Sequence, residues 1–242
     1  MYEYCKNFIE DCCDANGKPC EFLGKDNWCY KNMVEHYLEQ VFNNHKNKAS
    51  KKFIYIVRNP HQYEQTDALV LRKLGHNVEI QERAQDFAEQ LRRADAMADY
   101  VYVEKDLFNE DGFLVLRPTK NINGVGLDYH FYTDCRNLGL INFLDFNKIS
   151  LYKKRVLVYG NDLDLVEKLI ALGAIVTIST NKNLESRDFD LIIALDKENF
   201  LNCYPVHIPV IDVARCCINT DMREVVSDCH WFNVLGVLTQ IW

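Results

Sequence analysis

Short apolar runs alternate with amphipathic stretches in the first half of the chain. Residues 53–57 form a continuous run of β-forming side chains, which is typical of a buried strand. Further strands are predicted over 78–80 and 100–103, and helices over 63–74 and 84–98 lie between them. The order strand, helix, strand, helix, strand predicts a parallel sheet with helices on its faces.

The same alternation begins again after a helix predicted over 137–146. Its strands are predicted over 155–159, 175–179, 191–195 and 209–213, with a helix over 162–172 after the first of them. Strands spaced about twenty residues apart in this way are typical of a Rossmann-type nucleotide-binding unit. The sequence therefore predicts an α/β protein with a Cys-rich N-terminal extension (1–27), an N-terminal α/β lobe (28–136) and a C-terminal Rossmann-type parallel-sheet lobe (137–242).

Composition and charge narrow the kinds of partner that we expect. The 242 residues carry a formal net charge of −7, whereas nucleic-acid binders usually show a basic footprint, so no nucleic-acid partner is predicted. No apolar run approaches the ~20 residues that span a bilayer. The acidic first residues, with Glu3 and Glu10, lack the basic start and the apolar core of a signal peptide. We therefore expect no membrane partner and a location in the cytoplasm, with the interior of an organelle as the alternative.

The chain contains ten cysteines, and five of them fall between Cys5 and Cys29. No pair has the Cys-x-x-Cys spacing and the usual zinc spacings are absent, so no metal site is predicted. In a reducing compartment such thiols serve mainly as small buried hydrophobic side chains. A metal site or a disulfide cluster within the first thirty residues is the alternative.

Four segments share their order and spacing with segments of a known family. Asp111–Pro118 is similar to that family's Asp-Gly-Ile-Leu-Val-Gln-Leu-Pro, and 176–184 is similar to the segment after its second Rossmann strand. Val210–Val213 matches its Val-Ile-Asp-Val, and 226–231 is similar to its Val-Gly-Asp-Val-Asp-Phe. Together, from about residue 24 to 234, the chain resembles the bifunctional methylenetetrahydrofolate dehydrogenase/methenyltetrahydrofolate cyclohydrolases. The related shikimate dehydrogenase architecture is the rival interpretation.

The resemblance implies catalytic positions in the first lobe. In the family, a Tyr and a Lys four residues later share one face of the helix after the first strand, and the Lys performs acid–base chemistry on the folate. Tyr63 matches the Tyr, but the position four residues later is Asp67, whose charge is opposite. Asp128 is the candidate for the Asp that anchors the pterin amino group in the family.

The implied substrate-binding segment, Leu116, Arg117 and Pro118, also departs from the family. Leu116 replaces a Gln, and an apolar side chain cannot donate a hydrogen bond to a pterin. Arg117 and Lys120 could bind an anion instead. The alternative is that they lie at the solvated edge of a strand.

The implied cofactor loop keeps only part of the family pattern Gly-Arg-Ser-x-x-Val-Gly-x-Pro. Gly160 remains, but Asn161 and Asp162 replace the Arg and Ser, and the second Gly is lost. Asp162 and Asp164 would repel a pyrophosphate, and both are good residues for the first turn of the following helix. By the same resemblance, Ser179, Thr180 and Asp212 complete the cofactor-binding set. The implied cofactor is NAD or NADP, with no cofactor as the alternative, and we expect NAD to bind better because it lacks the 2′-phosphate.

The sequence therefore indicates a diverged protein of one-carbon folate metabolism whose parent activities are weak or lost. One alternative is an active NAD(P)-dependent methylenetetrahydrofolate dehydrogenase that binds a folate-type small molecule. Another is a non-catalytic scaffold. Because the family's closing C-terminal segment is not evident, the apolar ends 1–25 and 234–242 are predicted to be contact surfaces of a homodimer or larger assembly. The competing interpretation is that both ends fold back on their own lobes.

Overall fold

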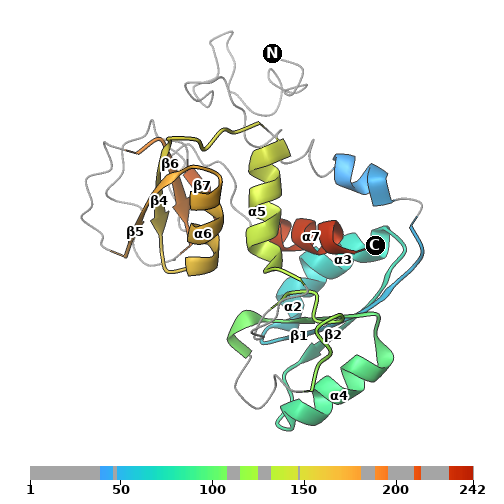
Figure 1. Cartoon of the computed structure of the whole chain (residues 1–242). Helices are drawn as coiled ribbons and strands as arrows, with labels where there is room; N and C mark the ends of the chain where they lie inside the picture. Colours follow the sequence, from blue (N-terminus) through green and yellow to red (C-terminus); the bar gives the residue numbers. More distant parts are fainter. Residues whose placement is uncertain are drawn as a thin grey trace, which may run out of the picture. The chain divides into compact units, whose positions relative to one another are not determined.

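The computed structural model describes residues 39–45, 48–107, 115–124, 132–146, 148–180, 189–195, 210–213 and 229–241. After a helical segment over 39–45, the elements in chain order are β1 (Lys52–Val57), α2 (Pro60–Tyr63), η1 (Glu64–Ala68), α3 (Leu69–Lys73), β2 (Asn77–Glu82), α4 (Phe87–Met97), β3 (Tyr100–Val103), η2 (Lys105–Leu107), α5 (Cys135–Phe146), β4 (Arg155–Tyr159), α6 (Leu163–Ala171), β5 (Ile175–Ser179), β6 (Leu191–Ala194), β7 (Val210–Asp212) and α7 (Cys229–Gln240) (Figure 1).

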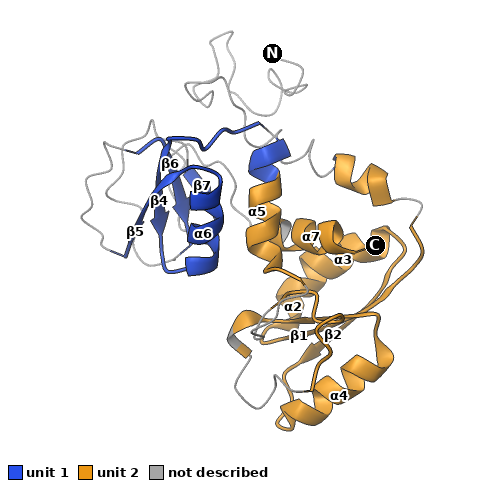
Figure 2. Ribbon diagram, in the orientation of Figure 1, with its two compact units in different colours: residues 1–39, 143–229 blue, residues 40–142, 230–242 orange. Residues whose placement is uncertain are grey.

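The chain divides into two compact units, and each has its own parallel sheet (Figure 2). Unit 1 comprises residues 1–39 and 143–229, and unit 2 comprises residues 40–142 and 230–242. The predicted α/β class with two lobes is thus confirmed. The units differ from the predicted ranges at three places, because residues 28–39 fall in unit 1, whereas residues 137–142 of α5 and residues 230–242, with α7, fall in unit 2. The predicted extension 1–27 lies outside the described residues.

The central strand of the unit 2 sheet is buried on both faces. Its strand order is β2-β1-β3, and both pairings are parallel. Alternate residues of the central strand β1 face opposite sides: Tyr55 contacts the core that includes α3, α5 and α7, whereas Ile54 contacts the core that includes α4. A central parallel strand needs apolar side chains on both sides, which explains the continuous apolar run in the sequence.

The helix after β1 is not regular. The predicted single helix over 63–74 begins earlier, with Pro60 in its first turn, and a π-helical turn η1 lies between α2 and α3. A π-helical turn holds extra residues and is common at functional sites. Tyr63, Asp67 and Leu71 are all buried, so they share the inward-facing side of this helical segment.

Helices α5 and α7 pack backbone to backbone through two glycines. A Cβ on Gly139 of α5 would lie 1.9 Å from the carbonyl oxygen of Phe232 in α7. A Cβ on Gly236 of α7 would lie 1.8 Å from the carbonyl oxygen of Cys135 in α5. Both distances are far below any real contact, so only glycine allows the two helices to approach this closely.

The apolar C-terminal end is buried in unit 2. Val234, Val237 and Leu238 have no exposed surface, and they belong to the core that also contains Tyr55. The prediction that residues 234–242 form an exposed contact surface is therefore wrong for the described part of this segment, 234–241. Helix α7 instead folds back on the protein's own sheet β2-β1-β3.

The sheet of unit 1 has the order β5-β4-β6-β7, with all pairings parallel. The chain leaves β4 through α6 to one side and later returns to β6 on the other side. This makes the carboxyl end of β4 a topological switch point, where open α/β sheets bind their ligands. The predicted Rossmann-type arrangement is confirmed.

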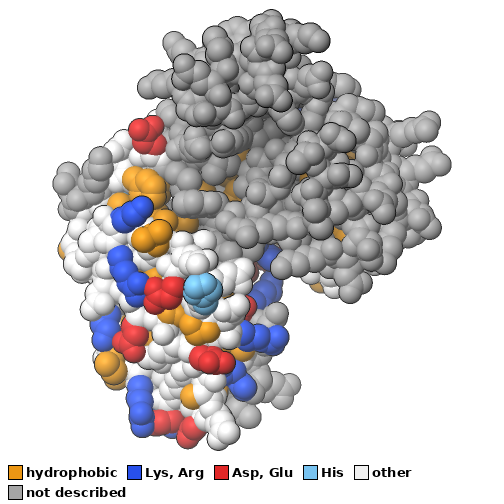
Figure 3. Space-filling model, turned by 180° about the vertical axis from the view of Figure 1, so that it is seen from behind, with side chains coloured by type: hydrophobic (Ala, Val, Ile, Leu, Met, Phe, Trp, Pro, Cys, Tyr) orange, Lys and Arg blue, Asp and Glu red, His pale blue; other side chains and the backbone are white. Residues whose placement is uncertain are grey.

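Two features of the described chain are the mixed charge of one face and the limited length of its apolar helices. On the face shown in Figure 3, Lys and Arg side chains lie next to Asp and Glu side chains, so charges of both signs are interspersed. Among the described residues, no helix is long and apolar enough to cross a membrane.

The α5–α7 contact predicts a strong effect of one methyl group. Gly236→Ala should lower the free energy of unfolding by about 3 kcal/mol, because the new Cβ would overlap the backbone of α5. Gly75→Ala is the matched control, since its Cβ would meet nothing within 4 Å and only the φ of +88° opposes it, at about 1 kcal/mol. Urea unfolding measures both, and equal losses in the two variants would contradict the close contact.

Candidate functional site

The candidate site in unit 2 centres on the carboxylate of Asp67, which has no exposed surface. The Asn233 side-chain amide donates to its Oδ1 at 2.5 Å, and the Thr66 hydroxyl donates to its Oδ2 at 2.9 Å. The Tyr102 hydroxyl donates in turn to Oδ1 of Asn233 at 3.0 Å. Residues from η1, α7 and β3 thus form one hydrogen-bonded chain, in which a single amide satisfies both a buried acid and a buried phenol.

Three tyrosine rings surround this chain of hydrogen bonds. Tyr55 and Tyr102 are cross-strand partners on β1 and β3, and their rings stack with centroids 4.5 Å apart. The Tyr63 ring lies 6.0 Å from that of Tyr55 and 5.8 Å from that of Tyr102. The hydroxyl of Tyr55 is buried and has no hydrogen-bond partner within the described part of the chain. The cluster is aromatic and buried, with Asp67 as its acidic group.

Burial sets the protonation of the phenols. Desolvation raises the pKa of Tyr55 well above its ordinary value, and the negative charge of Asp67 raises it further. Desolvation also raises the pKa of Tyr102, with contributions from Tyr63 and Asp67. Both hydroxyls are therefore neutral at physiological pH, so they can donate hydrogen bonds but cannot act as bases.

Helix α7 supplies a second polar contact through Gln240. Its side-chain Nε2 donates to the carbonyl oxygens of Ile122 at 3.0 Å and Thr133 at 3.1 Å, and its Oε1 accepts the Thr133 N–H at 2.7 Å. The same Nε2 lies 3.3 Å from the sulfur of Cys135. Desolvation raises the pKa of the Cys135 thiol well above its ordinary value, so this thiol is protonated and unreactive.

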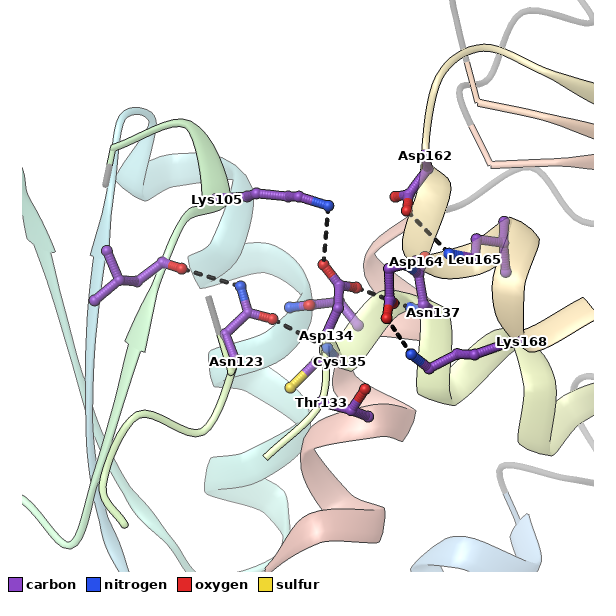
Figure 4. Close-up of polar contacts among 12 residues, drawn as sticks. Lys105, Asn123, Thr133, Asp134, Cys135, Asn137, Asp162, Asp164, Leu165 and Lys168 are labelled. Carbon is purple, nitrogen blue, oxygen red and sulfur yellow. Dashed lines mark hydrogen bonds and ion pairs between the residues drawn. The ribbon is translucent and has the colours of Figure 1, made fainter. Parts of the chain in front are cut away.

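The start of α5 is fixed by neighbouring side chains (Figure 4). Asn123 donates to the Val103 carbonyl and accepts the Cys135 N–H, both at 3.0 Å. Asp134 accepts the Asn137 N–H at 3.0 Å, which is a helix N-cap, and lies 3.8 Å from the Lys105 ammonium. These contacts hold the end of β3, the following loop and the first turn of α5 together.

The predicted substrate segment lies away from Asp67. Leu116 is buried in the core that contacts α4, on the opposite face of the sheet from Tyr63. Arg117 donates to the Asp95 carboxylate at 2.8 Å and also to the Asp95 carbonyl oxygen. Lys120 donates to the carbonyl oxygens of Asp95 and Ala98, both at 2.6 Å.

The last carbonyls of α4 are thus capped by these two cations, which is a favourable position for positive charge. The structure therefore gives Arg117 and Lys120 a helix-capping role and offers no support for an anion site there. Pro118 is exposed, and Asp128 lies outside the described residues.

The predicted cofactor residues gather at the carboxyl ends of the strands of unit 1. Gly160 follows β4 with a φ of +126°, and its N–H donates to the carbonyl of Ser179 at 3.0 Å. Asn161 and Thr180 are exposed, and Asp212 is the last residue of β7. This is the edge at which a dinucleotide binds in Rossmann-type sheets.

Acidic groups occupy the entry to α6. The Asp162 carboxylate is buried and accepts the Leu165 N–H at 3.1 Å, so it is the N-cap of this helix (Figure 4). Asp164, in the first turn, pairs with Lys168. In a dinucleotide site, a pyrophosphate would normally accept hydrogen bonds from the backbone N–H groups of the first helical turn and lie at the positive end of the helix dipole. Here the protein's own carboxylate takes the donor, and its charge opposes an anion.

Within the described part of the chain, no group of three or more His, Cys, Asp or Glu side chains could hold a metal ion. Cys135 is the one cysteine whose side chain is described. The other cysteines, including those of the N-terminal extension, lie outside the described side chains.

No family model and no curated protein matches the sequence. Solved structures do match. The bifunctional enzyme FolD, a methylenetetrahydrofolate dehydrogenase/cyclohydrolase from Campylobacter jejuni, is 17% identical with a TM-score of 0.61, covering 87% of this chain and 93% of that chain. The dehydrogenase-cyclohydrolase from Trypanosoma brucei, complexed with NADP and an inhibitor, is 14% identical with a TM-score of 0.60, covering 87% and 92%. This chain has the FolD fold.

The resemblance inferred from the sequence is thus confirmed at the level of the fold. Aspartate transcarbamoylase from Trypanosoma cruzi, in complex with phosphate, also matches, at 10% identity and a TM-score of 0.52, covering 88% of this chain and 91% of that chain. Enzymes of different chemistry therefore share this arrangement of elements with the chain. The fold alone does not determine the function, which depends on the residues of the site.

Sequence reasoning identified Tyr63 and Asp67 but missed the residues that surround them. Tyr55 and Tyr102 were predicted only as strand residues, although Tyr100 and Tyr102 repeat with the period of one strand face. Asn233 was missed as well. Its signal is a single amide within the apolar run 231–238, because a polar side chain inside such a run needs a buried partner.

The central hydrogen-bonded chain predicts a large cost for losing Asn233. Asn233→Ala should reduce the free energy of unfolding by about 2–4 kcal/mol, because Asp67 and Tyr102 both lose their amide partner in a dry environment. The control is Thr239→Ala on the exposed side of the same helix, which should stay within about 0.5 kcal/mol of the native protein. Similar losses for both variants would show that the buried chain contributes little.

Proposed function

We propose that this protein is a diverged relative of the methylenetetrahydrofolate dehydrogenase/cyclohydrolases that retains the fold and has lost the parent reactions. One observation carries the proposal. Asp67, at the position expected for the catalytic Lys, is fully buried and bonded to Asn233 and Thr66. Acid–base catalysis needs a group that the substrate can reach within hydrogen-bonding distance. A buried carboxylate whose oxygens accept internal donors does not meet that need.

The neighbouring tyrosines do not restore the lost function. Tyr63, which would be the family's Tyr, packs against Tyr55 and Tyr102, and the residue four positions later is Asp67. The raised pKa values of Tyr55 and Tyr102 keep their phenols neutral. The cluster is therefore suited to holding α7 against the sheet and unsuited to proton transfer.

A nicotinamide cofactor would meet an unfavourable site in unit 1. The similar enzyme from Trypanosoma brucei was crystallised with NADP, and Gly160 stands where the fold carries its phosphate loop. Asp162 and Asp164 place negative charge at the helix entry that would receive the pyrophosphate. We infer that any remaining cofactor binding is weak and favours NAD. The rival hypothesis, an active dehydrogenase, requires binding of ordinary strength here.

A role as a scaffold or as a subunit of an assembly would explain why the protein keeps this fold after losing the parent reactions. Large apolar side chains are exposed along α6, the turn after it and β5: Leu163, Ile170, Leu172, Ile175 and Ile178. Exposed apolar side chains grouped in this way favour association. We infer that the protein functions within a homodimer or larger assembly.

The loss of the acid–base group predicts no cyclohydrolase activity. The purified protein should not accelerate the loss of methenyltetrahydrofolate absorbance above buffer, while the Campylobacter jejuni enzyme assayed in parallel should do so. Turnover by this protein that disappears in Tyr63→Phe would show that the site retains the parent chemistry.

The acidic helix entry predicts weak NADP binding that improves when charge is removed. Calorimetric titration should give a dissociation constant above the micromolar range for the native protein. Asp162→Asn keeps the capping oxygen and removes the charge, so it should tighten binding by about 2- to 5-fold. Glu89→Gln, on α4 of the other unit, is the control and should have no effect. Micromolar binding by the native protein would favour the active dehydrogenase.

A further inference from the structure

Two buried histidines lie where the last turn of α7 meets the rest of unit 2. His45 ends the helical segment 39–45, and His76 lies in the turn between α3 and β2; each is only 5% exposed. The His45 side chain is hydrogen-bonded to the backbone of Leu238 in α7. The Lys48 ammonium, three residues after His45, donates to the carbonyl oxygen of Ile241 at 3.2 Å. This segment therefore holds the last carbonyls of α7.

The hydrogen bonds fix the neutral form of His76. Its Nδ1 accepts the Lys51 N–H at 3.2 Å, so this nitrogen carries a lone pair and the single ring hydrogen is on Nε2. The ring also packs edge-on against Phe53, with centroids 5.4 Å apart. Its Nε2 is buried and has no hydrogen-bond partner among the described residues.

His45 is held as the same tautomer by a different set of contacts. It donates to the Leu238 carbonyl, whereas its Nδ1 is buried and finds no partner in the described part of the chain. The ring hydrogen is therefore on Nε2, and Nδ1 carries a bare lone pair. A second hydrogen would have no acceptor on either ring, because Nδ1 of His76 faces the Lys51 N–H and Nδ1 of His45 has no partner among the described residues.

A metal ion does not fit this pair. Coordination by Nε2 of His76 would require its hydrogen to move to Nδ1, where it would face the Lys51 N–H. Two cations, Lys48 and Lys51, also act on the histidines and would oppose a metal charge. The gain of a proton, by contrast, would change the hydrogen-bonding contacts of both rings.

We propose that His45 and His76 form an acid-sensitive latch, which holds the last turn of α7 against unit 2 when both are neutral and releases it when they are protonated. A second hydrogen on His76 would lie on Nδ1, directly against the Lys51 amide. A second hydrogen on His45 would be buried without an acceptor, beside Lys48. In either case the ring must leave its place. Release of the turn frees Gln240 and Ile241 and loosens the helix that carries Asn233.

The direction of the pH dependence follows from the pKa values. Burial, with Lys48 and His76, lowers the pKa of His45 from 6.5 to about 4, and burial, with Lys48 and Lys51, lowers the pKa of His76. The released state therefore binds protons more readily than the latched state. The latch is stable above about pH 6.5 and weakens as the pH falls from 6.5 toward 4. For His45 alone, the linkage relation gives a roughly 30-fold shift of the opening equilibrium at pH 5 relative to pH 7.5.

Hydrogen exchange of the full-length protein tests the latch. Amides in the last turn of α7 should exchange about 30-fold faster at pH 5 than at pH 7.5, after correction for the intrinsic pH dependence of exchange. His45→Gln keeps a donor at the place of Nε2, and His76→Asn keeps an acceptor at the place of Nδ1, yet neither residue titrates. The double variant should lose the acid effect. His61→Gln, in which an exposed histidine of α2 is replaced, should keep it.

Two results would overturn the proposal. One is equal corrected protection of the last turn at both pH values in the native protein. The other is an acid effect of the same size in the double variant. If the double variant does not fold, NMR titration of the native protein decides the matter. Imidazole signals that remain neutral until the last turn opens support the latch, whereas both histidines titrating near pH 6.5 in the closed protein would refute it.

Discussion

The packing of helix α7 onto the sheet of unit 2 is the contact on which the rest of the site depends. Burying the Asp67 carboxylate in an aromatic cluster would cost several kcal/mol without donors in good geometry. The principal donor is Asn233, which lies 166 residues away along the chain. It reaches the carboxylate because Gly139 and Gly236 let α5 and α7 approach backbone to backbone. The core of unit 2 is therefore complete only when α7, from the end of the chain, packs onto its sheet.

The surroundings of Asp67 are matched to a carboxylate. A lysine at this position would need acceptors, whereas Asn233 presents its amide N–H and Thr66 its hydroxyl to the two oxygens. The side-chain carbonyl of Asn233 accepts a hydrogen bond from the Tyr102 hydroxyl, and this bond fixes the orientation of the amide. The change from Lys to Asp inferred from the family resemblance is thus accompanied by a matching hydrogen-bond partner on a distant helix. The acid and its two donors are thus matched in charge and in hydrogen-bond geometry.

Local patterns predicted most of the elements, because the period of apolar residues depends on near neighbours. The strand over 53–57 and the helix after the second sheet's first strand were both found, with Asp162 as a capping residue. The π-helical turn within the helix after β1 was not predicted, since one widened turn leaves the apolar pattern almost unchanged. The role of α7 was also missed: a run of apolar residues indicates burial but does not identify the sheet that it covers. For the same reason Asp67 was found by its spacing from Tyr63, whereas Asn233 required the tertiary structure.

The most direct test of this account is a double-mutant cycle between Asp67 and Asn233. The free energies of unfolding of the native protein, Asp67→Ala, Asn233→Ala and the double variant would be measured by urea denaturation under one buffer condition. If the amide and the carboxylate depend on each other, the double variant should be more stable than the sum of the single losses implies, with a coupling energy of about 2 kcal/mol or more. Single losses that add to within about 0.5 kcal/mol would contradict the claim that α7 and Asp67 form one energetic unit.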